Sequence, residues 1–150
     1  GLKAEISEAF PTAMRGEKID RAALGREVFT DEAKLKQLEA LMHPRVRAVN
    51  LALIEKAKAE GWPLLVLEIP LLYETGAEAI CDRVAVVTAR PEIQRQRVFA
   101  RPNMSEKRLL GILARQMPDE EKRARADFII DTSDGLESSA AQVAEVMSRL

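Results

Sequence analysis

Residues 64–74, LLVLEIPLLYE, give the first indication of the fold, because five of the first six are apolar. Such a run is typical of a strand that is buried on both faces. Two later segments, 82–89 (DRVAVVTA) and 126–132 (ADFIIDT), are also short and rich in aliphatic and β-branched residues. Helical stretches separate these segments, and that alternation indicates an α/β fold with a parallel sheet covered by helices on both faces. We therefore predict strands at 63–69, 82–89 and 126–132.

Helical patterns fill the first 62 residues. The opening segment GLKAEISEAF has the pattern of an amphipathic helix with Ile6 and Phe10 on its apolar face. Asp20 is a suitable N-cap for a short helix, and Thr30 or Asp31 for a longer one. Pro44 in that longer helix has no backbone N–H and disfavours helical angles at the residue before it, so we expect a break at residues 43–44.

The last segment of the chain predicts a further helix. Asp134 is followed three residues later by Glu137, a spacing that resembles a capping box at a helix start. Its expected apolar stripe contains Val143, Val146, Met147 and Leu150.

Composition excludes several classes of protein. A chain of 150 residues and 16.7 kDa is long enough for one domain with a sizeable core. The net charge of -1 gives no reason to expect nucleic acid or an anionic membrane as partner. Residues 90–125 hold ten Lys or Arg against five Asp or Glu, but Phe99 is their one aromatic residue, so this segment suggests a local anion site and not a nucleic-acid surface.

Cysteine usage and hydropathy bear on the compartment. The single cysteine, Cys81, cannot form an internal disulfide and suits a reducing environment. No apolar run reaches the roughly 18 residues that a membrane span needs. We expect a cytoplasmic protein with no membrane partner, present as a monomer or a weak homo-oligomer.

Polar residues at the carboxyl ends of the predicted strands are the first candidates for chemistry, since ligands of open α/β sheets bind beyond those ends. Glu68 stands near the end of an otherwise apolar strand, where a carboxylate needs a cation or hydrogen-bond donors. Its functional interpretation is an acid beside Mg²⁺ or a phosphate-binding lysine, and the alternative is an edge-strand residue that points to solvent. Pro70 turns the chain across the mouth of a cleft, or it simply ends the strand.

Arginines provide the second set of candidates. Arg97 and Arg101 are four residues apart and share one helix face, where their planar guanidinium groups suit a phosphate. The alternative is that they complement the dipole at the helix C-terminus, which is the interpretation we favour for Arg95. His43, the only histidine, has no accompanying cluster of metal ligands, so we expect no metal site there.

Several motifs in this order resemble the dephospho-coenzyme A kinase family of P-loop kinases. The matching segments are IDRAALGREVF, LEALMHPRVR, EIPLLYETG, RPEIQRQRVFAR and ILARQMPDEEKRARADFIID, followed by the closing helix. Together they span nearly the whole chain from about residue 5 onward. The resemblance implies phosphorylation of the ribose 3′-hydroxyl of dephospho-CoA with ATP and Mg²⁺.

The resemblance assigns roles to individual residues and divides the chain into regions. It implies phosphate contacts for Arg97 and Arg101 and a metal- or phosphate-side role for Glu68. The implied substrate-binding residues are His43, Pro44, Pro70, Leu71, Leu72, Tyr73 and Glu74, and the implied ATP-side residues are Thr132, Ser133 and Gly135. The regions are a helical CoA domain at 1–62, core elements at 63–96, a lid at 97–122, and a final strand and helix at 123–150.

The most severe departure of the sequence from the family pattern concerns the phosphate-binding loop. It contains no G-x-x-x-x-G-K-[ST], the loop that cradles phosphates in these kinases. The resemblance implies that this loop and the first strands, including a central strand between 64–69 and 82–89, are missing from this chain. Two alternatives therefore stay open: a CoA- or nucleotide-binding fragment without catalysis, and another small-molecule kinase of the same fold.

We expect the 150-residue chain by itself to have negligible kinase activity, because it contains no P-loop to supply backbone donors, a lysine and a metal-binding hydroxyl. A phosphoryl-transfer assay on the purified, sequence-verified chain checks this expectation. Measurable turnover would contradict it.

Overall fold

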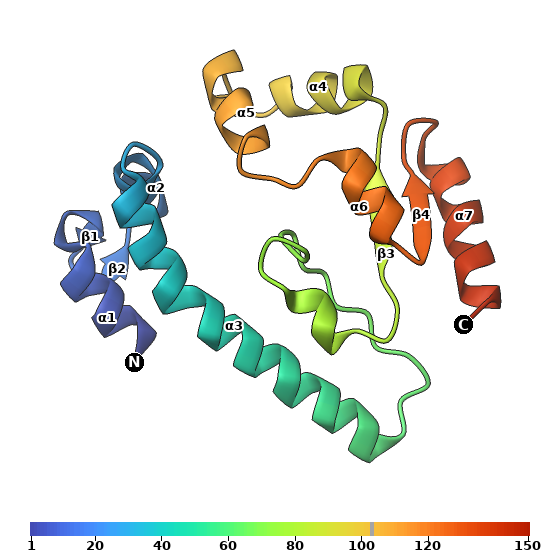
Figure 1. The fold of residues 1–150 in the computed structure, drawn as a ribbon. Coiled ribbons are helices and arrows are strands. Elements are labelled where there is room, and N and C mark those ends of the chain that lie inside the picture. The colour runs from blue at the N-terminus through green and yellow to red at the C-terminus, as the bar shows by residue number, and fades with distance from the viewer. Residues whose placement is uncertain (103) are drawn as a thin grey trace. The chain divides into compact units, whose positions relative to one another are not determined.

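The computed structural model describes residues 1–102 and 104–150, and these form two compact units, Gly1–Leu67 and Glu68–Leu150 (Figure 1). The first unit contains helix α1 (Leu2–Ala9), a 3-10 turn η1 (Pro11–Ala13), strands β1 (Met14–Arg15) and β2 (Lys18–Ile19), and helices α2 (Arg21–Phe29) and α3 (Glu32–Glu60). The second contains the 3-10 turn η2 (Ala77–Ile80), β3 (Ala85–Thr88), α4 (Pro91–Phe99), α5 (Glu106–Leu113), α6 (Asp119–Arg125), β4 (Phe128–Asp131) and α7 (Leu136–Ser148).

The core of the first unit forms where α1, η1 and α2 meet the first turns of α3. Phe10 is completely buried there, beside Ile6, Ala13 and Val28. The expected amphipathic helix at the N-terminus is therefore confirmed. The hairpin of β1 and β2 was not predicted; its turn contains Gly16 at φ 57°, a left-handed angle that favours glycine.

Side-chain caps start both later helices of this unit as predicted. Asp20 accepts hydrogen bonds from the amides of Ala22 and Ala23, and Asp31 accepts them from Ala33 and Lys34. Helix α3 ends at Gly61, which adopts the left-handed conformation at φ 66°.

The predicted break at residues 43–44 is wrong, because α3 continues through Pro44 from Glu32 to Glu60. A proline costs a helix one N–H donor and crowds the carbonyl four residues earlier, but it does not end a helix whose other turns remain bonded. The guanidinium of Arg45 donates to the carbonyl of Leu41 at 2.8 Å, which places an additional donor in this turn.

The second unit is built on a parallel ladder, as expected for an α/β fold. Strand β3 pairs with β4 in the register Ala85 with Phe128 to Thr88 with Asp131. Helix α6 lies beside β3, and α7 lies beside β4 (Figure 1). The carboxyl ends of both strands therefore open on the same edge, followed by residues 89–90 and 132–135.

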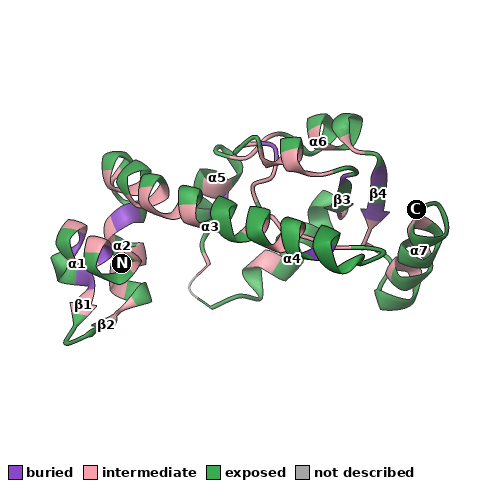
Figure 2. Cartoon of the chain, turned by 90° about the horizontal axis from the view of Figure 1, so that it is seen from below, coloured by how far each residue is buried: buried purple, intermediate pink, exposed green. Residues whose placement is uncertain are grey.

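The two strands alternate between a buried and an exposed face. Val86, Thr88, Phe128 and Ile130 are buried, whereas Val87, between two of them, is 65% exposed (Figure 2). A strand places successive side chains on opposite faces, so one face of this ladder is covered within the described part of the chain.

The predicted strand at 63–69 is not formed. Residues 64–69 have no ladder partner among the described residues, and Val66 is 77% exposed. An apolar run becomes a strand only when a neighbouring strand receives its N–H and C=O groups. The other two predicted strands are confirmed in shortened form, as β3 and β4.

The predicted capping box of α7 is also wrong. Gly135 occupies the N-cap position and no side chain caps the helix. Asp134 instead pairs with Arg90. The predicted apolar stripe of α7 is mostly exposed, including Val143, Met147 and Leu150.

Replacing Phe10 with alanine is expected to lower the free energy of unfolding of the first unit by about 3–5 kcal/mol, because it removes a fully buried ring and leaves a cavity. Urea unfolding followed by circular dichroism measures the effect. Phe29→Ala is the matched control, since Phe29 is 54% exposed. Equal losses in the two variants would contradict the assignment of Phe10 to the core.

Candidate functional site

The carboxyl ends of β3 and β4 are bonded to each other through Thr88 and Thr132. The carbonyl of Thr88 accepts hydrogen bonds from the backbone N–H of Thr132 at 2.9 Å and from its hydroxyl at 3.0 Å. The backbone N–H of Arg90 donates to the hydroxyl of Ser133 at 2.7 Å. The loops that follow the two strands therefore form one connected edge, as parallel pairing predicts.

Arg97 joins helix α4 to this edge. One of its terminal nitrogens donates to the hydroxyl of Thr132 at 2.9 Å, and the other donates to the carbonyl of Thr132 at 2.6 Å. A planar guanidinium suits such a two-point contact. The structure thus brings together one predicted phosphate-contact residue and the loop predicted to lie on the ATP side.

The loop at 132–135 has further fixed points. Asp131 accepts a hydrogen bond from the amide of Ser133 at 2.8 Å, and that contact together with the Ser133 hydroxyl lowers the pKa of Asp131. Arg90 pairs with Asp134 at 3.1 Å. Gly135 has φ 94°, an angle at which a side chain would be strained. These contacts hold the loop in one conformation beyond β4.

Arg95 and Arg101, the other two arginines between residues 95 and 101, differ in their contacts. Arg95 forms a two-point ion pair with Glu106 at the start of α5, and it also lies over the ring of Phe99. It therefore connects α4 with α5 and does not simply complement the end of its helix. Arg101 is exposed and forms no ion pair with another described residue, so its guanidinium is accessible to an anion.

The predicted substrate loop is a series of turns. Pro70 is exposed, Leu71 and Leu72 are partly buried, and Tyr73 is buried. The amide of Thr75 donates to the carbonyl of Leu71 at 3.1 Å. Pro70 ends no strand, because none forms at 63–69, and a role for its turns at the mouth of a cleft stays a prediction.

Glu74 is held by two donors from the other side of the unit. Its Oε1 accepts hydrogen bonds from Lys122 Nζ at 2.9 Å and from the backbone N–H of Met117 at 2.8 Å. Burial, the largest influence, raises the pKa of Glu74, but the hydrogen bonds from Lys122 and Met117 more than offset it and leave the pKa below its usual 4.5. Glu74 is therefore ionised at neutral pH.

Tyr73 and Glu78 face a second cation, Arg125. The Arg125 guanidinium lies 4.4 Å from the centroid of the Tyr73 ring and donates to Glu78 at 2.7 Å. The Tyr73 hydroxyl and one carboxylate oxygen each of Glu74 and Glu78 are buried and have no hydrogen-bond partner among the described residues. Burial raises the pKa of Tyr73, so its phenol stays neutral.

The sequence reasoning missed the contribution of α6. Asp119, Lys122 and Arg125 follow one another at intervals of three, which places them on neighbouring positions of one helix face. The hydroxyl of Thr88 donates to both oxygens of Asp119 at 2.9 Å. The spacing of three was the signal available in the sequence, but it did not reveal the partners.

The buried environment that we expected for Glu68 is not observed. We expected its carboxylate inside a buried strand, but no strand forms at 63–69 and Glu68 is exposed. His43 and Pro44 lie in the first unit, exposed along the middle of α3. Their expected contact with substrate stays a prediction.

The described residues supply no metal centre of their own: between 1–102 and 104–150 no three His, Cys, Asp or Glu side chains are grouped so that they could hold a metal ion. In the same part of the chain, no helix has the length and apolarity that a membrane crossing requires.

Replacing Glu74 with glutamine is expected to reduce the free energy of unfolding of the second unit by about 1–2 kcal/mol at pH 7, because Lys122 loses its charged partner. The folded-state pKa of Glu74 is depressed, so its stabilising contribution exists above pH 4.5 and disappears as the pH falls through the lower folded value. The stability of the variant should therefore fall less steeply below pH 4.5.

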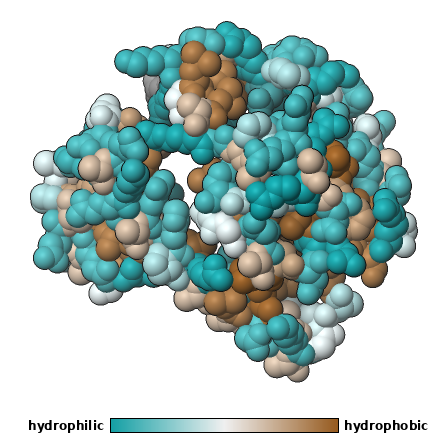
Figure 3. All heavy atoms as spheres, viewed as in Figure 1, coloured by the Kyte–Doolittle hydropathy of each residue, from teal (hydrophilic) through white to brown (hydrophobic). Residues whose placement is uncertain are grey.

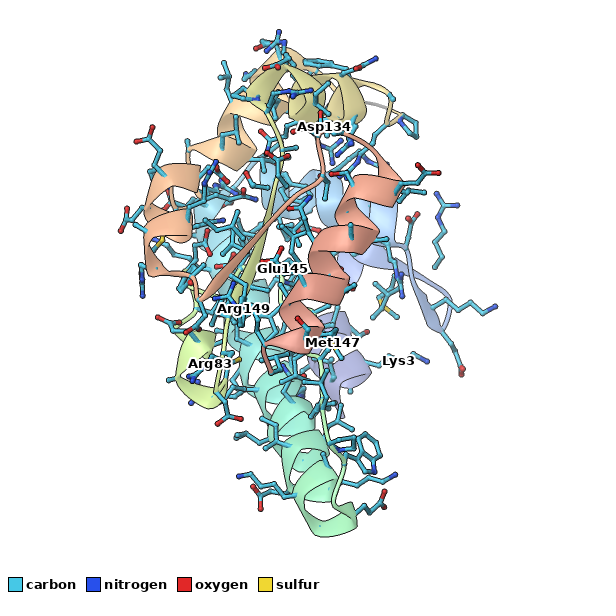
Figure 4. The ribbon with its side chains drawn as sticks, turned by 90° about the vertical axis from the view of Figure 1, so that its right-hand side faces the viewer. Lys3, Arg83, Asp134, Glu145, Met147 and Arg149 are labelled. Carbon is cyan, nitrogen blue, oxygen red and sulfur yellow. The ribbon has the colours of Figure 1, made fainter. Side chains whose placement is uncertain are left out.

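Urea unfolding at pH 7 and at about pH 3.5 measures this difference. Glu145→Gln is the control, since Glu145 is exposed on α7 (Figure 4). The same pH dependence in wild type and Glu74→Gln would show that the pair with Lys122 does not couple to folding.

Comparison with known proteins agrees with this architecture. A sequence model of dephospho-CoA kinases matches residues 2–138. A dephospho-CoA kinase of Rhodopseudomonas palustris is 48% identical over 142 residues, which cover 95% of this chain and 71% of that protein. One of Mesorhizobium japonicum is 50% identical over 151 residues, which cover 100% of this chain and 77% of the relative.

Solved structures give the same result. The crystal structure of TT1252 from Thermus thermophilus superposes with a TM-score of 0.76 at 39% identity, covering 98% of this chain and 75% of that one. A dephospho-CoA kinase from Campylobacter jejuni superposes with a TM-score of 0.66 at 30% identity, covering 98% and 74%. On the match over residues 2–138 and these relatives, the chain belongs to the dephospho-CoA kinase family.

Proposed function

We propose that this chain supplies acceptor-side and phosphate-side residues for transfer of the γ-phosphoryl group of ATP to the ribose 3′-hydroxyl of dephospho-CoA. In this reaction the 3′-oxygen forms a bond to the γ-phosphorus while the bond to the β,γ-bridging oxygen breaks. ADP leaves, and the hydroxyl proton passes to a base. The single observation that supports this function best is the family match over residues 2–138.

Arg101 is the residue we propose to contact the transferred phosphoryl group. It is exposed beyond the end of α4 and forms no ion pair with another described residue, so binding a phosphate does not require breaking an existing pair. Charge that develops on the phosphoryl oxygens is stabilised by a guanidinium held near them.

Arg97 has a different proposed role. Both of its terminal nitrogens donate to Thr132, so it sets the position of the loop at 132–135 relative to α4. We assign that loop, with Thr132, Ser133 and Gly135, to the ATP side of the site. Its fixed conformation lowers the ordering cost of binding a nucleotide there.

The turns at 70–74 and the exposed His43 and Pro44 are the proposed acceptor-side residues. They come from different units, so each is proposed separately for contact with dephospho-CoA. ATP is the proposed phosphoryl donor, with Mg²⁺ accompanying its phosphates.

Arg101→Gln is expected to weaken ATP binding by about 10–100-fold, the effect of losing one charged hydrogen bond to phosphate. Titration calorimetry with ATP and with dephospho-CoA, run beside an assay of ADP release, measures binding and turnover separately. The control is Arg83→Gln, because Arg83 precedes β3 and lies at the end of the sheet away from Asp134 (Figure 4).

The outcomes separate the candidate functions. Binding of dephospho-CoA, together with ATP binding that depends on Arg101 but not on Arg83, supports the proposal. Binding of dephospho-CoA without binding of ATP supports the alternative of a CoA-binding module. Failure to bind either ligand would overturn the proposed function for this chain.

A further inference from the structure

Helix α6 contacts three other segments of the second unit through one face. Asp119 accepts hydrogen bonds from the buried Thr88 of β3. One turn later Lys122 pairs with Glu74 at 2.9 Å, and a further turn on Arg125 pairs with Glu78 at 2.7 Å. The helix is therefore attached along its whole length.

The middle contact is the most sheltered of these ion pairs. The side chains of Lys122 and Glu74 are 18% and 15% exposed, whereas those of Arg123 and Asp119, on the same helix, are about half exposed and 3.9 Å apart. A sheltered pair is screened less by salt and solvent than an exposed one, so it holds its geometry more firmly.

Met117 extends the attachment to the segment just before α6. Its backbone N–H donates to Glu74 at 2.8 Å, and its sulfur accepts a contact from Arg125 at 3.7 Å. Its side chain also packs against the buried cluster of Tyr73, Val84 and Val86. The chain is therefore fixed in place from residue 117 onward.

Helix α5 is attached differently. Glu106, its first residue, forms an ion pair with Arg95, and both side chains are about half exposed. Apolar side chains gather on its outer surface, where Leu110 is 57% exposed (Figure 3). Exposed ion pairs contribute little stability, so this pair by itself attaches α5 only weakly.

We propose that Lys122 is a positioning residue of the acceptor site: through Glu74 it fixes the turns at 70–74, so that α6 belongs to the rigid frame of the site. The attachment begins at Met117, within the range 97–122 for which the family resemblance implies a lid. The inference rests on the proposed function for its assignment of residues 70–74 to dephospho-CoA, but the attachment itself does not.

The test compares Lys122→Met with Arg123→Met, a neighbour on the same helix that loses the same charge without touching Glu74. Hydrogen exchange is followed at the amides of Thr75 and Ala77, which donate to Leu71 and Leu72 within the turns. Calorimetric titration with dephospho-CoA measures the affinity of the proposed acceptor site for this ligand. Lys122→Arg keeps the charge, and Lys122→Gln is a second, milder variant in case Lys122→Met does not fold.

Lys122→Met should raise exchange at Thr75 and Ala77 and weaken dephospho-CoA binding by about tenfold. Exchange at the amide of Thr132, which bonds to Thr88 in the ladder, should stay unchanged. Arg123→Met should match the wild type in exchange and in affinity. Lys122→Arg should recover most of the affinity for dephospho-CoA. Lys122→Gln should have an affinity between those of Lys122→Met and Lys122→Arg.

Unchanged exchange at Thr75 and Ala77 in Lys122→Met, or in Lys122→Gln, would overturn the inference. A uniform rise that includes Thr132 would also overturn it, because that result would indicate only a loss of global stability. If the wild-type chain does not bind dephospho-CoA, the proposed function fails, while the exchange data still decide whether Lys122 positions the turns.

Discussion

Thr88 connects the parts of the second unit that surround the candidate site. Its carbonyl accepts two hydrogen bonds from Thr132, which joins the ends of β3 and β4, and its hydroxyl donates to Asp119, which attaches α6. The residue is buried, so each of these polar groups needs its partner inside the protein. Arg97 then reaches the same edge through Thr132, and α6 reaches the turns at 70–74 through Lys122.

Contacts within the protein explain most of the positive charge of the basic segment at 90–125. Most of its arginines are engaged within the protein: Arg90 with Asp134, Arg95 with Glu106, Arg97 with Thr132 and Arg125 with Glu78. The local excess of positive charge is therefore not a uniform anion-binding surface. Arg101, which is exposed and unpaired with any described carboxylate, is one of the positions where that charge is accessible.

Part of the fold could be predicted because local physical rules specify it. The caps at Asp20 and Asp31 form as expected, since a short polar side chain before a helix satisfies its free amides in almost any surroundings. The strands at 85–88 and 128–131 form where apolar and β-branched residues cluster. The strand at 63–69 and the break at Pro44 were wrong, because pairing and continuation of a helix depend on neighbours that a local pattern does not contain.

For the candidate site too, some features follow from the sequence and others only from the tertiary structure. The sequence by itself determined the family motifs, the clustering of arginines and the polar residues at the strand ends, because these depend only on residue type and spacing. Only the tertiary structure decided that Arg97 bonds to Thr132, that Glu74 pairs with Lys122 and that Glu68 is exposed. Side chains 35 to 48 positions apart meet only after the ladder and helix α6 are in place, and spacing along the chain cannot specify which donor a buried carboxylate receives.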